Sequence, residues 1–192
     1  MGKERLTAFT DGVVAIIITI MVLELKVPHG TSLSDLAPLL PVVLSYVLSF
    51  VYVAIYWNNH HHMLALCERV DGPILWANMH LLFWLSLVPF VTSWLSESHF
   101  NGVPVAAYGG VLIMAGLAYT ILSRLLVHLH GPDSDIARAM GRDFKGYASL
   151  VAYALAIGLA FVRPQASLAL YVAVAAMWFI PDRRVERTIQ SV

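Results

Sequence analysis

The sequence predicts an all-α integral membrane protein, with six transmembrane helices per subunit and both termini in the cytoplasm. Its composition leads to this fold class, since 59% of the 192 residues are apolar and only 12% are charged. Soluble domains carry about 25% charged residues, and half that density is too low to cover a water-exposed surface. Two further observations support this fold class: apolar segments alternate with short breaks, and basic residues gather at alternate breaks.

Six apolar segments follow one another along the chain, and breaks rich in proline, glycine and charge separate them. The predicted spans cover residues 9–25, 39–63, 74–95, 103–127, 144–162 and 165–180. A transmembrane helix takes roughly 20 residues, so six helices use about 120 residues and leave about 70 for loops and tails. We therefore expect residues 1–192 to form a single six-helix transmembrane domain, without a separate soluble domain.

The break that follows each span justifies its limits. The break at 27–30 follows the first span, and we expect this span to be a retained helix because no small-residue cleavage site follows it. Charged breaks at 68–73 and 97–102 limit the second and third spans. The longest polar stretch, 128–146, follows the fourth span, and we expect a solvated loop there. An Arg-Pro pair at 163–164 divides the fifth span from the sixth, which is the shortest.

The distribution of lysine and arginine indicates the orientation of the chain. With a cytoplasmic N-terminus, ten of the twelve basic residues lie in cytoplasmic segments, and only Lys26 and Arg163 lie outside. Basic residues favour the cytoplasmic side of short loops. The sequence therefore predicts that both termini are cytoplasmic and that the number of spans is even.

Charge and cysteine content exclude several other classes of protein. Twelve basic and twelve acidic residues give a net charge of zero, which argues against a nucleic-acid-binding protein. Cys67 is the single cysteine, so neither a disulfide framework nor a cysteine-only metal cluster is possible.

The first span carries polar residues at its cytoplasmic end. Arg5, Phe9, Thr10 and Asp11 fall in Arg5-Leu6-Thr7-Ala8-Phe9-Thr10-Asp11-Gly12, ahead of a helix made almost wholly of β-branched residues and leucine. This segment resembles the opening helix of the transmembrane-protein-175 family, with Thr10 in place of serine. Residues 56–62 and 78–92 resemble the end of the second helix and the third helix of that family.

The resemblance implies a passive, potassium-selective cation channel and not an enzyme. It implies a homotetramer of single-repeat subunits in the bacterial inner membrane, with K+ as the permeating ion and no cofactor. The family's pore constrictions correspond to Ile16, Ile20 and Leu23, with Thr19 as a neighbouring hydroxyl layer. These positions are spaced i, i+3, i+4, i+7 and share one helical face. Spacing alone equally fits a lipid-facing or packing face. We expect Glu24 to attract cations at the outer mouth.

A polar network is expected to position this helix. Arg5, Thr10 and Asp11 begin the first span at the membrane depth where the second span ends and the third begins, so they are within reach of the polar side chains there. Those side chains are Trp57, His61 and Asn78. Trp57 and His61 are spaced i, i+4, so both can point at one acceptor. We expect Asp11 to be that acceptor and to be buried.

The histidines leave a second class of function open. A haem- or metal-binding membrane redox protein could use histidines of the second and third spans. Three consecutive residues on a helix point about 100° apart, so His60, His61 and His62 cannot all bind one ion within one chain. We therefore expect no metal site, and His80 is expected to be a packing residue. A proton-coupled transporter is a third class, but no acidic residue lies at mid-span.

Overall fold

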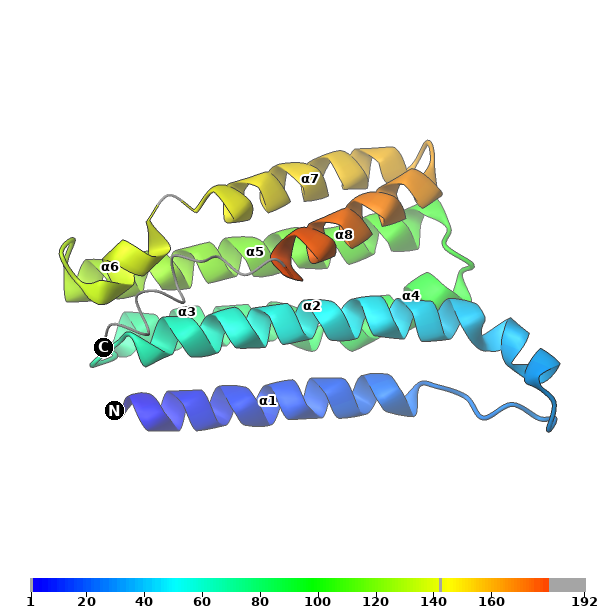
Figure 1. The fold of residues 1–192 in the computed structure, drawn as a ribbon, viewed down its shortest axis with the longest axis horizontal. Coiled ribbons are helices and arrows are strands. Elements are labelled where there is room, and N and C mark those ends of the chain that lie inside the picture. The colour runs from blue at the N-terminus through cyan, green and yellow to red at the C-terminus, as the bar shows by residue number, and fades with distance from the viewer. Residues whose placement is uncertain (1, 142, 180–192) are drawn as a thin grey trace.

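The computed structural model describes residues 2–141 and 143–179, which form an elongated bundle of helices (Figure 1). In chain order the elements are α1 (Lys3–Leu23), the 3-10 helix η1 (Leu33–Leu39), α2 (Leu40–Ala65), α3 (Gly72–Ser86), α4 (Val88–Glu97), α5 (Gly102–His130), α6 (Asp135–Met140), α7 (Phe144–Ala160) and α8 (Pro164–Phe179). The described part of the chain contains no strand. The predicted all-α fold class is therefore confirmed.

Among the described residues, four helical stretches are long and apolar enough to cross a membrane: Lys3–Leu23, Leu33–Ala65, Gly72–Glu97 and Gly102–His130. The apolar helices α7 and α8 have 17 and 16 residues, fewer than the roughly 20 of a typical span. Six spans therefore remain a prediction. Position 180 of the last predicted span lies outside the described residues. So do four of the ten basic residues counted for the cytoplasmic side, namely Arg142, Arg183, Arg184 and Arg187.

The third predicted span is two helices rather than one. Leu87 ends α3 and precedes α4, and Pro89 is the second residue of α4. Proline has no N–H to donate to the carbonyl four residues earlier, and its ring clashes with that carbonyl. The apolar run is continuous in sequence, but its helix is interrupted at this point.

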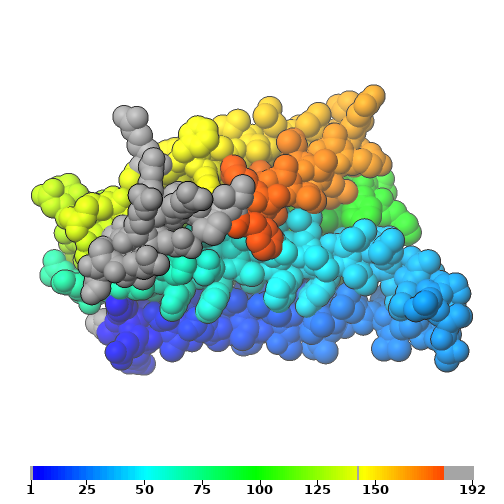
Figure 2. All heavy atoms as spheres, viewed as in Figure 1, coloured from blue at the N-terminus to red at the C-terminus, as the bar shows by residue number. Residues whose placement is uncertain are grey.

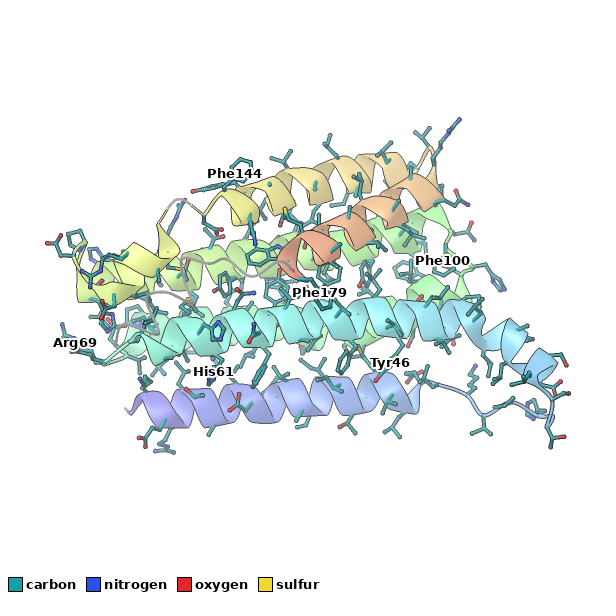
Figure 3. The ribbon with its side chains drawn as sticks, viewed as in Figure 1. Tyr46, His61, Arg69, Phe100, Phe144 and Phe179 are labelled. Carbon is teal, nitrogen blue, oxygen red and sulfur yellow. The ribbon has the colours of Figure 1, made fainter. Side chains whose placement is uncertain are left out.

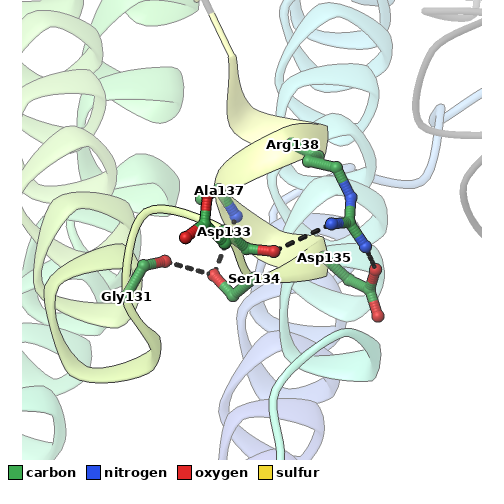
Figure 4. Close-up of polar contacts among 6 residues, drawn as sticks. All are labelled: Gly131, Asp133, Ser134, Asp135, Ala137 and Arg138. Carbon is green, nitrogen blue, oxygen red and sulfur yellow. Dashed lines mark hydrogen bonds and ion pairs between the residues drawn. The ribbon is translucent and has the colours of Figure 1, made fainter.

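The polar stretch 128–146 contains a short helix, which corrects the expectation of a solvated loop. Gly131 ends α5 with a φ of +89°, a backbone conformation that favours glycine. Ser134 then caps α6 by accepting a hydrogen bond from the backbone N–H of Ala137, and Arg138 pairs with Asp135 (Figure 4). Ile136 of α6 is fully buried. This segment therefore packs onto the bundle.

A core of tyrosines joins α2, α5, α7 and α8. The Tyr52 hydroxyl donates to the backbone carbonyl of Tyr171 at 2.6 Å, and the Tyr171 hydroxyl donates to that of Val105 at 3.1 Å. Gly109 permits this approach, because a Cβ atom there would lie 2.1 Å from the Tyr171 hydroxyl. Helix α5 packs against α3 and α7, α7 packs against α8, and α1 contacts α2, α3 and α4.

Candidate functional site

Helix α1 lies along one edge of the subunit, and its whole length reaches the surface (Figure 2). Its buried residues recur at helical spacing and form one stripe: Leu6, Thr10, Val14, Ile17 and Met21. This stripe packs against α2, α3 and α4. Lys3 and Asp11 make polar contacts beside this stripe, and Val13 and Ile18 are partly buried at its edges. The remaining side of the helix, here called its unpartnered side, is exposed in the described part of the subunit.

The four residues expected to line a pore lie on this unpartnered side of α1. Ile16 and Leu23 are 60% and 76% exposed, and Thr19 and Ile20 are also exposed. The Thr19 hydroxyl donates to the backbone carbonyl of Ala15 at 2.8 Å, so it lies close to the helix backbone. Ile18, by contrast, is partly buried against the core. The subunit therefore leaves these four residues available to a shared surface.

Asp11 makes one of the expected contacts, but it is not buried. The indole N–H of Trp57 donates to Oδ1 of Asp11 at 2.8 Å, and this hydrogen bond joins α1 to α2. The His61 ring stacks on the Trp57 ring with a centroid distance of 5.7 Å. His61 lies on the side of α2 that faces α1 (Figure 3). Asp11 is exposed in the subunit, so the expected burial is not provided by one subunit alone.

A second, buried set of polar contacts joins three helices. The Asn78 side-chain amide of α3 donates to the Thr10 hydroxyl of α1 at 3.0 Å, and its oxygen lies 2.7 Å from Nε2 of His60 on α2. All three side chains are buried. Because the amide oxygen can only accept, Nε2 of His60 is the donor. The histidine in contact with Asn78 is thus His60, which the sequence analysis did not place in the network.

Arg5 and Phe9 are exposed near the start of α1. Both residues lie on the part of the helix surface that the buried stripe leaves uncovered. The structure therefore brings together Asp11 with Trp57, and Thr10 with Asn78, while Arg5 and Phe9 face outward.

The other end of α1 borders an open groove of about 590 Å³ against α4. Glu24 lines this groove together with Ile20, Ser93 and Glu97. Lys26 forms an exposed ion pair with Glu97, with 3.9 Å between Nζ and Oε1. Glu97 is a second acidic residue at this end, and the sequence analysis did not identify it, since 73 residues separate it from Glu24.

The three consecutive histidines point in different directions. His60 is buried against Asn78, whereas His61 is exposed beside Trp57. Within residues 2–141 and 143–179, no three histidine, cysteine or acidic side chains are grouped so that they could hold a metal ion. The geometry of the described residues gives no support to the haem- or metal-binding alternative.

Comparison with known proteins identifies the family of this chain. The sequence profile of the endosomal/lysosomal potassium channel TMEM175 matches residues 5–89. A potassium channel of Chryseobacterium sp. is 52% identical over 191 residues, and the match covers all of both chains. This chain belongs to the TMEM175 family.

Two further proteins also match most of the chain. A potassium channel of Streptomyces collinus is 33% identical over 176 residues, covering 86% of this chain and 85% of its own. The crystal structure of a lysosomal potassium-selective channel TMEM175 homolog from Chamaesiphon minutus superposes with a TM-score of 0.79 at 28% identity, covering 93% of this chain and 96% of that one. The TMEM175 family consists of ion channels, so the chain is not placed among enzymes.

Proposed function

We propose that this chain forms a potassium-selective channel that conducts ions passively through a pore lined by α1. The observation that carries the proposal is the division of α1 into a packed stripe and an unpartnered side. That side carries Ile16, Thr19, Ile20 and Leu23 at helical spacing. Relatives that cover all or most of the chain are described as potassium channels, which supports K+ as the permeating ion.

A homotetramer would give the unpartnered side of α1 its partners. One helix cannot enclose a pathway, and closed cyclic symmetry is the usual way for identical subunits to do so. In this arrangement six spans cross the bacterial inner membrane, and both termini are cytoplasmic. The asymmetric distribution of basic residues supports this orientation.

Stacked apolar rings would control conduction. Four copies each of Ile16, Ile20 and Leu23 give narrow constrictions that exclude water, and an ion loses part of its hydration there. No side-chain or carbonyl ligand on these rings replaces the lost water. Potassium is less strongly hydrated than sodium, so the same constriction costs it less free energy. Selectivity would therefore arise from dehydration rather than from coordination.

Ion flux from liposomes tests the proposal. Purified protein in liposomes loaded with K+ is expected to release K+ down its gradient, and to release Na+ more slowly under the mirrored gradient. Empty liposomes prepared in parallel give the background. Flux equal to that of empty liposomes would contradict channel function, and equal K+ and Na+ flux would contradict selectivity.

A further inference from the structure

His130, the last residue of α5, contacts the α2–α3 segment, residues 66–71. The backbone N–H groups of Glu68 and Arg69 lie 3.1 and 3.5 Å from its Nε2, and its Nδ1 lies 2.9 Å from the Leu126 carbonyl oxygen. Backbone N–H groups only donate and carbonyl oxygens only accept. Nε2 must therefore accept, and Nδ1 must carry the proton. These contacts require the neutral imidazole.

The α2–α3 segment also holds the start of α1. The Lys3 ammonium group donates to the backbone carbonyl of Cys67 at 2.7 Å, and Cys67 is buried. The start of α1, the connection from α2 to α3, and α6 lie at the same end of the bundle (Figure 1). A continuous set of contacts thus runs from α5 through His130 and the α2–α3 segment to α1.

Hydrogen bonds also hold the turn that follows His130 in the chain. The Gly131 N–H donates to the Val127 carbonyl at 2.9 Å, and the Ser134 hydroxyl donates to the Gly131 carbonyl at 2.6 Å (Figure 4). The Arg138 guanidinium donates to the Asp133 carbonyl at 2.8 Å. The His130 ring is therefore presented to the α2–α3 segment from a hydrogen-bonded turn.

Several other ionisable groups lie on the elements around the ring. In the described part of the chain they are Glu68, Arg69 and Asp71 on the α2–α3 segment, Lys3 and Glu4 on α1, Arg124 and His128 on α5, and Asp133, Asp135 and Arg138 on the turn and α6. Arg138 is paired with Asp135, and the Asp71 side chain accepts from the Ile74 N–H. His130 is distinguished by a ring nitrogen that itself accepts from the α2–α3 segment.

We propose that His130 is a positioning residue for the pore helix: its neutral ring fixes the α2–α3 segment, and protonation releases this segment and, through Lys3, the start of α1. Protonated imidazole donates from both nitrogens, so Nε2 no longer accepts from Glu68 and Arg69. Imidazole groups commonly change charge between about pH 8 and pH 5. The link is therefore closed when the ring is neutral and open when it is protonated.

Cys67 provides a direct test, because it is the only cysteine in the chain and lies buried within the released segment. Its labelling by a dipyridyl disulfide, which reacts in acid as well as in base, is measured in detergent and needs no ion conduction. His130→Gln serves as the matched variant, since its amide oxygen can accept without titrating. Comparison of the two proteins at the same pH cancels the chemistry of the thiol.

Equal labelling rates are expected for the natural protein and His130→Gln at about pH 8, and at least about fivefold faster labelling of the natural protein at about pH 5.5. His130→Leu should label rapidly at both pH values, because leucine offers no acceptor. A ratio of rates that does not change with pH would overturn the proposal. Slow labelling of His130→Leu at both pH values would overturn it as well.

Ion flux tests whether release of the α2–α3 segment affects α1. This test rests on the proposed channel function. In liposomes with the same pH on both sides, K+ flux of the natural protein should differ between about pH 8 and pH 5.5, and that of His130→Gln should not. Lys3→Met should lose the pH dependence of flux while Cys67 labelling remains pH-dependent. Labelling that changes with pH while flux does not would overturn the link to α1. Absence of flux in every sample would overturn the channel function, and labelling would still decide the role of His130.

Discussion

Thr10 and Asp11 are adjacent in sequence, but their side chains are in different surroundings. Thr10 is buried and takes part in the Thr10–Asn78–His60 contacts, whereas Asp11 is exposed and accepts from the Trp57 indole. A buried polar group that loses its partner cannot recover the lost hydrogen bond from water, whereas an exposed group can. The buried contacts are therefore expected to contribute more to stability.

Asn78→Leu should destabilise the protein more than Trp57→Phe. The leucine leaves both Thr10 and His60 without their partner, at a cost of about 1–3 kcal/mol for each unpaired group. Trp57→Phe removes one hydrogen bond from an exposed carboxylate and should cost about 1 kcal/mol. The midpoint of thermal unfolding in detergent measures both effects. An equal fall in this midpoint for the two variants would show that the buried contacts contribute no more to stability than the exposed one.

At the scale of the element, α1 combines a packed side and an unpartnered side along one helix. The division follows the 3.6-residue period, so isoleucines that are close together in the sequence lie on different sides of the helix. Ile16 and Ile20 are exposed, and Ile17 is buried at 2% exposure. Substitutions of chemically identical residues on this one helix can therefore separate an effect on conduction from an effect on packing.

Ile16→Asn should relax ion selectivity, and Ile18→Asn should not. An amide ring at position 16 widens and wets the constriction, so sodium loses less hydration on crossing it. We expect the K+/Na+ permeability ratio to fall by roughly tenfold, which corresponds to about 1.4 kcal/mol in the difference between the two barriers. Ile18 is partly buried against the core, so asparagine there should lower stability instead. Bi-ionic potentials measure the ratio, and an equal fall for both variants would contradict this pore face.

Glu24→Gln should lower conductance mainly at low salt. The Glu24 carboxylate lies on the groove at the end of α1, where a negative charge raises the local concentration of cations. The Debye length is about 30 Å at 0.01 M salt and about 3 Å at 1 M. Conductance should therefore fall by about half at 0.01 M and change little at 1 M. Glu68→Gln, an exposed carboxylate of the α2–α3 segment, is the control and should have no such dependence on salt.

At the scale of the whole molecule, the subunit has a tyrosine core to which α1 contributes no tyrosine. Helices α2, α5, α7 and α8 share the tyrosine core, whereas α1 contacts the bundle along one stripe. A homotetramer would bury the remaining surface of α1 at the centre of the assembly. The pore helix would then be held partly by its own subunit and partly by its neighbours.

Cysteine cross-linking tests this arrangement. In a Cys67→Ser background, Ile20→Cys should form disulfide-linked dimers on oxidation, because equivalent residues approach one another around a central axis. A disulfide requires Cα atoms within about 7 Å. Ile17→Cys is the matched control, since Ile17 is buried inside its own subunit, and it should remain monomeric on a denaturing gel. Equal cross-linking of both variants, or of neither, would contradict a pore lined by α1.

The sequence was sufficient to predict features that depend on local pattern. The apolar runs predicted the long helices, and the i, i+3, i+4, i+7 spacing placed Ile16, Thr19, Ile20 and Leu23 on one side of α1. The contact between Asp11 and Trp57 also followed from membrane depth. These features need only the helical period and the length of a span.

Features that depend on how helices rotate against one another were not predictable. Three consecutive histidines lie near the end of α2. The rotation of α2 about its axis decides which of them faces Asn78, and the packing of the whole bundle sets that rotation. His60, which the sequence analysis did not place in the network, is therefore the histidine that contacts Asn78. The burial of Ile136 depends in the same way on α6 meeting the bundle. The break at Leu87 does have a local cause in Pro89. The sequence analysis nevertheless predicted a single span there, because the apolar run is continuous.

The tyrosine core has a consequence for how far related sequences can diverge. Its hydroxyl groups donate to backbone carbonyls: Tyr52 to that of Tyr171, Tyr171 to that of Val105, and Tyr56 to that of Leu112. Every amino acid supplies a carbonyl, so the accepting position can change its side chain freely while the hydrogen bond is kept. Each bond thus constrains one residue instead of two. Tyr171 is both a donor and an acceptor, so Val105 and Leu112 are the positions of these three bonds that are free to accumulate substitutions, provided that the new side chains fit.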